Sequence, residues 1–583
     1  MRFRALREAA RVLWLVGAAA RRLARLDPAG ARHALGLVSG RGPGGRSMPV
    51  PVSAAEAALV IDAVEAALLS SEMSLGAVGS RAQSLRRRLD EAGWDGAWNA
   101  DPAAADAVVA VGLVEELPAG RVASELATLA ADGPAVLLLP TWPVGRHAAL
   151  DATSLRLLRS RDWWSDRVAE AALEPIVQVR RSAAGYDCLV LRDRPAPARE
   201  RPRPTDAGGG HAPVVRINDD LSAANSFAWI SASIALALED TGGRVSIAPT
   251  AISTSFGDLR RARLAALVEG EDGGSPPADS EVGWTHFWPQ YRRPLGGRLP
   301  LALFAINYQF GRRDLAGFDP WMRELIGSSM PIAPISSFCR DVLVDAGVAP
   351  DRTAIVPMAV TDGIEGVEPG RIPRARALKL LHVTNAADLD RNGTPLALAA
   401  YRAAFEPADD VTLVVRDYGS YSAAVDAEVA ALAQRGYDVR YWPMFFAEDR
   451  LGAFLGAFDA LLAPFRGEGF GIKLLDAMAC ATPPVCPFYG GPRDFVDDSV
   501  AVALDYDLVP VSAGYDQAQI ALGNEPRWAE CRHGSLVEVL RGLLDDPAGL
   551  ARRGTAARER ALSRFTWRHT AERIGELVEA HRG

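Results

Sequence analysis

Short apolar runs alternate with helix-period segments along most of the chain. Runs such as Leu301–Ile306 and Val411–Val415 are rich in aliphatic residues, which predicts buried strands. Segments such as Pro395–Phe405 and Ala423–Gln434 place apolar residues at helical spacing. Strands that alternate with helices favour parallel, doubly wound sheets, so we predict an α/β fold that binds ligands at the carboxyl ends of its strands. The predicted strands are Ala107–Val111, Ala135–Leu139, Val214–Ile217, Val245–Ile247, Leu301–Ile306, Ala354–Val356, Lys379–Val383, Val411–Val415 and Ala460–Ala463.

Three breaks in this pattern divide the chain. Arg41–Gly45 interrupts the first helical region, and Pro195–Pro213 is rich in proline, arginine and glycine without periodic apolar residues, as in an interdomain linker. A softer break lies at Gly363–Arg376. The predicted organisation is a basic amphipathic helical region at 1–45, an α/β domain at 46–195, a linker at 196–213, two Rossmann-like domains at 214–365 and 366–565, and a terminal helix at 566–583.

The composition is that of an ordinary globular protein. Of the 583 residues, 49% are hydrophobic and 23% are charged, and the formal net charge is −8. A general nucleic-acid-binding protein would carry a basic surface, so we expect no nucleic-acid partner. The five cysteines lie far apart and have no CxxC spacing, which argues against a disulfide framework or a structural zinc site and favours a reducing cytoplasm.

The first 26 residues combine basic side chains with the apolar stretch Val12–Ala20. This stretch is too short to span a bilayer. It has the basic flank of a secretory signal, but Arg21 and Arg22 follow it directly. We interpret residues 1–26 as a basic amphipathic helix that either packs on its own domain or touches a membrane surface, and the sequence leaves both open. The expected location is the cytoplasm, with peripheral contact at the inner face of the membrane under the second alternative.

A glycine-bearing loop follows one of the last predicted strands. The strand Ala460–Ala463 leads into Gly467-Glu468-Gly469-Phe470-Gly471, and a helix begins near Ile472. Glycines let the backbone approach a ligand closely, and a helix N-terminus offers free N–H groups and positive potential that suit a diphosphate. Asp476 lies eight positions after Glu468, inside the helix. One carboxylate can therefore reach a sugar while the other reaches a ribose, because carboxylates accept charge-assisted hydrogen bonds from hydroxyl groups.

The stretch Ala463–Asp498 resembles the E-x7-E signature of family-4 retaining glycosyltransferases. It reads APFRGEGFGIKLLDAMACATPPVCPFYGGPRDFVDD, with Asp476 in place of the second glutamate and Lys473 in place of an apolar residue or proline. The resemblance implies the GT-B fold, in which an acceptor domain precedes a nucleotide-sugar donor domain, and it implies retention of the anomeric configuration and catalysis without a bound metal. In this family Glu468 would hold sugar hydroxyls and Asp476 the ribose. The other residues expected against the donor are Gly469, Phe470, Gly471, Ile472 and Asn392.

Basic residues that would neutralise the donor diphosphate follow two other predicted strands. Leu380–Phe405 resembles the first strand, basic turn and helix of the family's donor domain, but the Arg-Lys-Gly of that turn is Arg391-Asn392-Gly393 here. Asn392 therefore stands where the family has a lysine that faces the phosphate. Val411–Asp417 resembles the following strand and carries Arg416 near its end. Either Arg391 or Arg416 supplies the charge, and the sequence leaves the choice open.

The expected acceptor domain shows shorter matches to the same family. His286, Trp288 and Pro289 match a His-x-Trp-Pro motif of related enzymes, while Gln309 replaces the glutamate of their Trp-Glu-Tyr-Gly motif. His286 either positions a sugar hydroxyl or has a purely structural role, and both alternatives stay open. The tail Arg564–His581 resembles the terminal helix that crosses back onto the acceptor domain in this family.

Residues 46–195 hold a further α/β unit. Ala107–Val111, Glu115–Pro118 and Ala135–Pro140 resemble the back half of a class I methyltransferase. The glycine-rich turn of the front half is matched poorly by Leu75–Ser80, which has no acidic residue before it. We predict a degenerate methyltransferase-like domain that does not bind S-adenosylmethionine.

These observations predict transfer of a sugar from a nucleoside diphosphate sugar to an acceptor hydroxyl, in glycan or glycoconjugate synthesis. The nucleotide sugar is a substrate, and we expect no tightly bound cofactor and no metal. The acceptor is a glycan, a lipid-linked molecule or a small molecule. The missing lysine at position 392 keeps an alternative open, a pseudo-glycosyltransferase that binds nucleotide sugar or acts as a scaffold without turnover. A bifunctional methyl- and glycosyltransferase is the third hypothesis.

Overall fold

The computed structural model describes residues 214–580 with short gaps, together with the backbone of five strands between residues 75 and 193. The gaps are residues 223–225, 254–255, 257, 270–279, 285–294, 296–298, 365, 373–374, 419–420 and 447. Residues 1–45 and His286 lie outside the described residues, so the expectations for them stay predictions. Of the predicted glycine turn Leu75–Ser80, residues 75–78 form a strand, and residues 79–80 lie outside the described residues.

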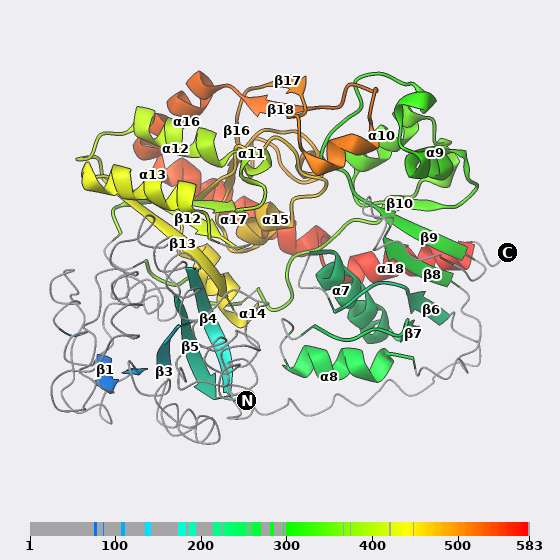
Figure 1. Ribbon diagram of the computed structural model, residues 1–583, viewed down its shortest axis with the longest axis horizontal. Helices are drawn as coiled ribbons and strands as arrows, with labels where there is room; N and C mark the ends of the chain where they lie inside the picture. Colours follow the sequence, from blue (N-terminus) through cyan, green and yellow to red (C-terminus); the bar gives the residue numbers. More distant parts are fainter. Residues whose placement is uncertain are drawn as a thin grey trace, which may run out of the picture.

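A five-stranded parallel sheet forms the centre of the domain that begins at Val214, called here the central domain. Its strand order is β10-β9-β8-β6-β7. The strands are β6 (Val214–Ile217), β7 (Arg244–Ile247), β8 (Ser280–Trp284), β9 (Leu299–Phe304) and β10 (Ile332–Pro334), and the helices are α7 (Ser226–Asp240), α8 (Asp258–Leu267), α9 (Pro320–Gly327) and α10 (Ser337–Ala346). Figure 1 shows this domain in green.

Two differences from the sequence pattern have clear causes. Strand β8 was not predicted because it begins with polar residues. These residues are Ser280 and Glu281, and both are buried. The Ser280 hydroxyl donates to the Leu299 carbonyl at 2.7 Å, and Glu281 forms an ion pair with Arg216 at 2.7 Å. The predicted strand Ala354–Val356 is wrong: its N–H groups reach β10, but Pro357 follows and has no N–H with which to continue a ladder.

A second parallel sheet organises the C-terminal domain, in the order β13-β12-β11-β14-β15-β16. Its strands are β11 (Leu378–Thr384), β12 (Val411–Asp417), β13 (Asp438–Phe446), β14 (Ala460–Leu462), β15 (Pro484–Cys486) and β16 (Val502–Ala503). Its helices are α11 (Leu389–Asn392), α12 (Thr394–Ala404), α13 (Ala423–Gln434), α14 (Glu448–Gly456), α15 (Ile472–Ala479), α16 (His533–Asp545) and α17 (Pro547–Arg564), and β17 (Tyr506–Pro510) forms a hairpin with β18 (Arg527–Cys531). Strands β11, β12, β14 and β15 are strongly apolar because they are buried on both faces. The α/β prediction with parallel sheets is confirmed.

The last helix, α18 (Trp567–Ala580), returns to the central domain and packs against α7 (Figure 1). The Trp567 ring meets the Trp229 ring edge to face, with centroids 5.5 Å apart. The Thr570 hydroxyl donates to the Pro357 carbonyl at 2.8 Å, in the segment that connects the two sheets. The helix therefore ties the end of the chain to the domain in which the described part begins.

The N-terminal unit joins the second sheet edge to edge. Its strands are β1 (Leu75–Val78), β2 (Ala107–Ala110), β3 (Ala135–Pro140), β4 (Leu173–Arg181) and β5 (Tyr186–Asp193). Strands β1 to β3 are parallel, β5 lies antiparallel between β3 and β4, and β4 pairs antiparallel with Met444–Phe446 of β13. The result is one eleven-stranded sheet. Because β3 and β13 run in opposite directions, the two units present the carboxyl ends of their parallel strands at opposite edges of this sheet.

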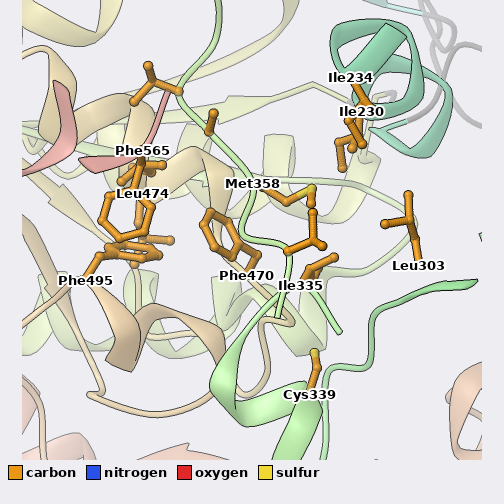
Figure 2. Close-up of a cluster of buried hydrophobic side chains, with 14 of the residues drawn as sticks. Ile230, Ile234, Leu303, Ile335, Cys339, Met358, Phe470, Leu474, Phe495 and Phe565 are labelled. Carbon is orange, nitrogen blue, oxygen red and sulfur yellow. The ribbon is translucent and has the colours of Figure 1, made fainter. Parts of the chain in front are cut away.

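One apolar cluster spans the junction between the central and C-terminal domains. Figure 2 shows Phe470 of the loop beside Met358 of the connecting segment and Ile335 of the central domain. Leu474 of α15 lies on the other side of Phe470, beside Phe565 and Phe495. The Phe470 ring lies 6.2 Å from the Phe565 ring at the end of α17. These side chains are almost fully buried, so the domain junction is held largely by the hydrophobic effect.

Candidate active site

The glycine loop, residues 467–471, connects β14 to α15 and lies against the central domain. The Gly469 N–H donates to Asn307 Oδ1 at 2.9 Å, and the Ser336 hydroxyl donates to the Gly469 carbonyl at 2.7 Å. A Cβ atom at Gly467 would stand 1.8 Å from the Asn307 carbonyl oxygen, so only glycine permits this approach. The loop predicted to meet a ligand is therefore at the junction of the two domains.

Helix α15 begins at Ile472, directly after Gly471. Gly471 has a φ of +96°, a left-handed conformation that favours glycine, and this turns the loop into the helix. The Phe470 side chain is buried, with its ring 5.4 Å from the Phe495 ring. Of the predicted donor contacts, Phe470 can thus offer only its backbone, because its ring anchors the loop in the apolar cluster.

Two cations surround the Glu468 carboxylate. The Lys473 Nζ lies 2.7 Å from Glu468 Oε1, and Arg391 Nη1 lies 3.3 Å from the same oxygen. Arg391 also pairs with Asp388 and donates to the Gly467 carbonyl at 2.9 Å. Burial acts to raise the pKa of Glu468, but Lys473 and Arg391 outweigh it, so the pKa lies below its ordinary value. Glu468 is therefore ionised at neutral pH and held in a fixed position.

Asn392 lies beside Lys473 although they are 81 positions apart in the chain. The Lys473 ammonium donates to Asn392 Oδ1, and Asn392 Nδ2 donates to the Asp388 carbonyl at 2.7 Å. The turn that carries Arg391 and Asn392 thus meets the first turn of α15. No sequence pattern predicts this contact, because Lys473 replaces a residue that the family keeps apolar or as proline.

Asp476 occupies the buried face of α15 and contacts the segment that connects the two domains. Its Oδ1 accepts the Thr361 N–H at 2.7 Å, and its Oδ2 accepts the Thr361 hydroxyl at 2.8 Å. Only 5% of the residue is exposed, and this burial raises the pKa of Asp476 to about 7. Both carboxylate oxygens therefore have protein partners, and contact with a ribose stays a prediction.

The ion pairs of Glu468 among the described residues are with Arg391 and Lys473 and not with Arg416. Arg416 lies near the carboxyl end of β12, with its guanidinium carbon 4.9 Å from the centre of the Phe446 ring and 5.5 Å from that of Phe454. Burial lowers the pKa of Arg416 to about 10, and the charge of Asp476 acts in the opposite direction. Its Nε atom is buried without a hydrogen-bond partner among the described residues. Of the two basic candidates, Arg391 accompanies Glu468 and Arg416 stands nearer Asp476.

The β17–β18 hairpin bridges from the C-terminal domain to the central domain. Gln309 and Arg527 exchange backbone hydrogen bonds of 2.9 and 2.8 Å. On the loop between the two strands, the Tyr515 hydroxyl accepts from Asn307 Nδ2 at 3.1 Å. Tyr515 and Asn307 are therefore neighbours of the glycine loop that sequence reasoning missed, because a loop residue without a motif carries no positional signal.

Some predicted features fall outside what the structure describes. His286, Trp288 and Pro289 lie in the segment 285–294. Within the described residues, no helix is long and apolar enough to cross a membrane. The same residues contain no group of three or more histidine, cysteine, aspartate or glutamate side chains placed to hold a metal ion.

Comparison with known proteins gives a family model and several relatives that each match part of the chain. A model described as family 4 glycosyltransferase in conflict systems matches residues 342–574. The alpha-maltose-1-phosphate synthase of Mycobacterium tuberculosis is 32% identical over 380 residues, which cover 57% of this chain and 84% of that protein. The D-inositol 3-phosphate glycosyltransferase of Kineococcus radiotolerans is 37% identical over 122 residues, or 21% of this chain and 24% of that protein.

Solved structures also align with part of the chain. HepE of Anabaena in complex with UDP and glucose aligns with a TM-score of 0.44 and 12% identity, over 63% of this chain and 100% of that one. Sucrose-phosphate synthase from Thermosynechococcus elongatus aligns with a TM-score of 0.44 and 15% identity, over 63% of this chain and 98% of that one.

Proposed function

Because the chain belongs to the family-4 glycosyltransferases, we propose that it transfers a sugar from a nucleoside diphosphate sugar to an acceptor hydroxyl with retention of the anomeric configuration. The observation that supports this proposal best is the Glu468 carboxylate. It stands in a glycine loop between two domains and is held by Lys473 and Arg391. A fixed carboxylate beside cations suits a ligand that combines sugar hydroxyls with a diphosphate.

The proposed reaction breaks the bond between the sugar's anomeric carbon and a diphosphate oxygen, and the electron pair stays with the diphosphate. The acceptor oxygen forms the new bond to the anomeric carbon, and its proton passes to the departing diphosphate oxygen. Negative charge therefore grows on the diphosphate as positive charge grows on the sugar. Arg391 and the N-terminus of α15 would stabilise the first, and Glu468 would hold the sugar hydroxyls. Single preorganised donors of this kind contribute about 2.7–4 kcal/mol in other enzymes.

We propose that this chemistry needs no bound metal, because protein cations stand beside Glu468 to carry the charge of the leaving group. The donor would be a hexose nucleotide. The names of two relatives each contain a phosphorylated sugar or inositol. Phosphorylated small molecules are therefore the first acceptors to test, ahead of glycan and lipid-linked acceptors. The proposed location is the cytoplasm, with residues 1–26 as the segment that would contact a membrane.

The alternative is a protein that binds nucleotide sugar without turnover. One observation favours it: the charged groups of the site already have protein partners, since Glu468 pairs with Lys473 and both Asp476 oxygens accept from Thr361. A thermal-shift screen with UDP-, GDP-, ADP- and dTDP-sugars finds the donor, because a ligand at 100 times its Kd stabilises by about 2.7 kcal/mol. Transfer or hydrolysis of that donor supports the enzyme, and tight binding without either supports the alternative.

For residues 46–195 we propose an accessory domain of methyltransferase-like fold that does not bind S-adenosylmethionine. The three parallel strands β1 to β3 and the antiparallel hairpin β4–β5 support an α/β unit. Calorimetry with S-adenosylmethionine tests this proposal against the bifunctional hypothesis. Heat of binding would contradict the proposal and support a bifunctional methyl- and glycosyltransferase.

A further inference from the structure

We propose that Lys473 binds the diphosphate of the donor, in the place of the lysine that is absent from position 392. This proposal rests on the proposed function and adds the residue that completes its phosphate site. It starts from the contact between the Lys473 ammonium and the side chain of Asn392. In the family pattern the residue at position 392 is a lysine and carries the positive charge. In this chain it is Asn392, whose side chain accepts a hydrogen bond from Lys473 of α15.

The position of Lys473 is not what the helix alone would favour. Lys473 is the second residue of α15, where the helix dipole disfavours a positive charge. Its side chain is only 17% exposed and turns back to the glycine loop instead of extending into solvent. Glu468 and Asn392 compensate this placement. A lysine that served solubility alone would need neither partner.

Asn392 is oriented to receive the lysine. Its Nδ2 donates to the Asp388 carbonyl at 2.7 Å, which directs Oδ1 toward Lys473. An ammonium has three donors, and among the described residues Lys473 donates one hydrogen bond, to Asn392, and forms an ion pair with Glu468 at 2.7 Å. The ammonium therefore keeps donor capacity for a phosphate oxygen of a ligand that enters beside Glu468. Arg391, which contacts the same carboxylate, would be the second cation on the diphosphate.

The use of lysine at this position is itself unusual for this chain. Only two of the 64 basic residues are lysines, Lys379 and Lys473. Lysine carries a compact point charge on a flexible stem, whereas arginine carries a broad planar fork. Next to Arg391 and inside the first turn of α15, a compact cation fits where a second guanidinium would need more room. Lys379 pairs with Asp459 at 2.7 Å at the start of β11, the end of the strand away from the loop.

The scarcity of lysine permits a test on the unmodified protein. An amine-reactive acetylating reagent labels the full chain with and without UDP, GDP or ADP, and mass spectrometry measures the labelling rate of each lysine. At a saturating concentration, whichever nucleoside diphosphate binds should lower the labelling rate of Lys473 about tenfold or more. The labelling rate of Lys379 should not change. Equal labelling of Lys473 with and without a bound diphosphate would overturn the proposal. The matching nucleoside is the control, because it lacks the phosphates.

Variants give a second measurement by calorimetry. Lys473→Leu should lower the affinity for the nucleoside diphosphate about ten- to a hundredfold, as expected for loss of a charge-assisted hydrogen bond. The affinity for the nucleoside should fall much less. The double variant Asn392→Lys/Lys473→Leu restores the family pattern and should regain most of the affinity for the nucleoside diphosphate, while Lys379→Leu should change nothing. If Lys473→Leu binds the nucleoside diphosphate as tightly as wild type, the proposal for Lys473 is wrong and the proposed function is unaffected. Failure of the wild-type protein to bind any of the diphosphates sinks the proposed function instead. If Lys473→Leu fails to fold, the labelling experiment decides.

Discussion

Asp476 and Thr361 join helix α15 to the segment between the domains through two hydrogen bonds, of 2.7 and 2.8 Å. The pair is buried at the junction of the two domains. A substitution or a change of charge at Asp476 therefore affects how α15 packs on the connecting segment as well as any contact with a ligand. Because burial raises the pKa of Asp476 to about 7, the charge of this pair changes within the physiological range.

The first prediction concerns this titration. Between pH 4 and 7 the folded state holds the Asp476 proton and the unfolded state does not, so this group contributes stability at low pH that is lost as pH rises toward about 7. Asp476→Asn cannot titrate, and its Oδ1 can still accept the Thr361 N–H, while its Nδ2 can donate to the Thr361 hydroxyl and so reverses that hydrogen bond. Urea unfolding gives the free energy of unfolding of both proteins. The value for Asp476→Asn minus that for wild type should rise by roughly 2–3 kcal/mol from pH 5 to pH 8, because wild type loses the contribution of Asp476.

His382 does not disturb that comparison. Its pKa is lowered to about 4 by burial, but both proteins contain it and its contribution cancels in the difference. Parallel stability curves for wild type and Asp476→Asn would show that Asp476 does not titrate in this range.

The second prediction separates the two arginines that the sequence could not rank. Arg391→Leu removes a partner of Glu468 and Asp388 and should weaken nucleoside diphosphate binding about tenfold or more. Arg416→Leu should change the affinity less than threefold, because its guanidinium packs on Phe446 and Phe454 and its pKa is already lowered by burial. Calorimetry on both variants decides, and the reverse order of effects would assign the phosphate to Arg416.

The third prediction concerns the contact between Gly467 and Asn307. A methyl group at residue 467 would collide with the Asn307 carbonyl, so Gly467→Ala should destabilise the protein by about 1–3 kcal/mol and weaken donor binding. Gly534→Ala is the matched control. It lies in α16 with no atom within 4 Å of the added methyl, and it should be neutral or slightly stabilising. Equal urea midpoints for the two variants would mean that the loop can leave the central domain at no cost.

The fourth prediction concerns metal ions. If Arg391 and Lys473 carry the charge of the departing diphosphate, transfer should continue at an unchanged rate after chelation with EDTA. Loss of transfer that returns when Mg²⁺ or Mn²⁺ is added back would show that the two side chains do not suffice.

Sequence reasoning reached the fold because parallel strands buried on both faces leave an apolar signature, as in β11 and β12. It also placed the glycine loop before α15, since glycines and the helix start are local features. It missed the pairing of β4 with β13, because edge-to-edge pairing is made by backbone groups and leaves no mark on side chains.

The site was harder to predict than the fold. The contacts of Lys473 with Asn392 and of Asp476 with Thr361 join segments that are 81 and 115 positions apart, and no local pattern reports such distances. The loss of lysine at 392 and the gain of lysine at 473 look like two separate departures from the family when each is taken alone. Only the fold shows that the two positions touch.

The most direct test of the proposed function is donor turnover by the wild-type protein and by Glu468→Gln. The variant keeps the shape of the side chain but removes the charge that Lys473 and Arg391 hold. We predict that wild type releases nucleoside diphosphate from its donor sugar, and that Glu468→Gln still binds the donor but turns it over at least about a hundredfold more slowly. Equal turnover by the two proteins would contradict the role given to Glu468.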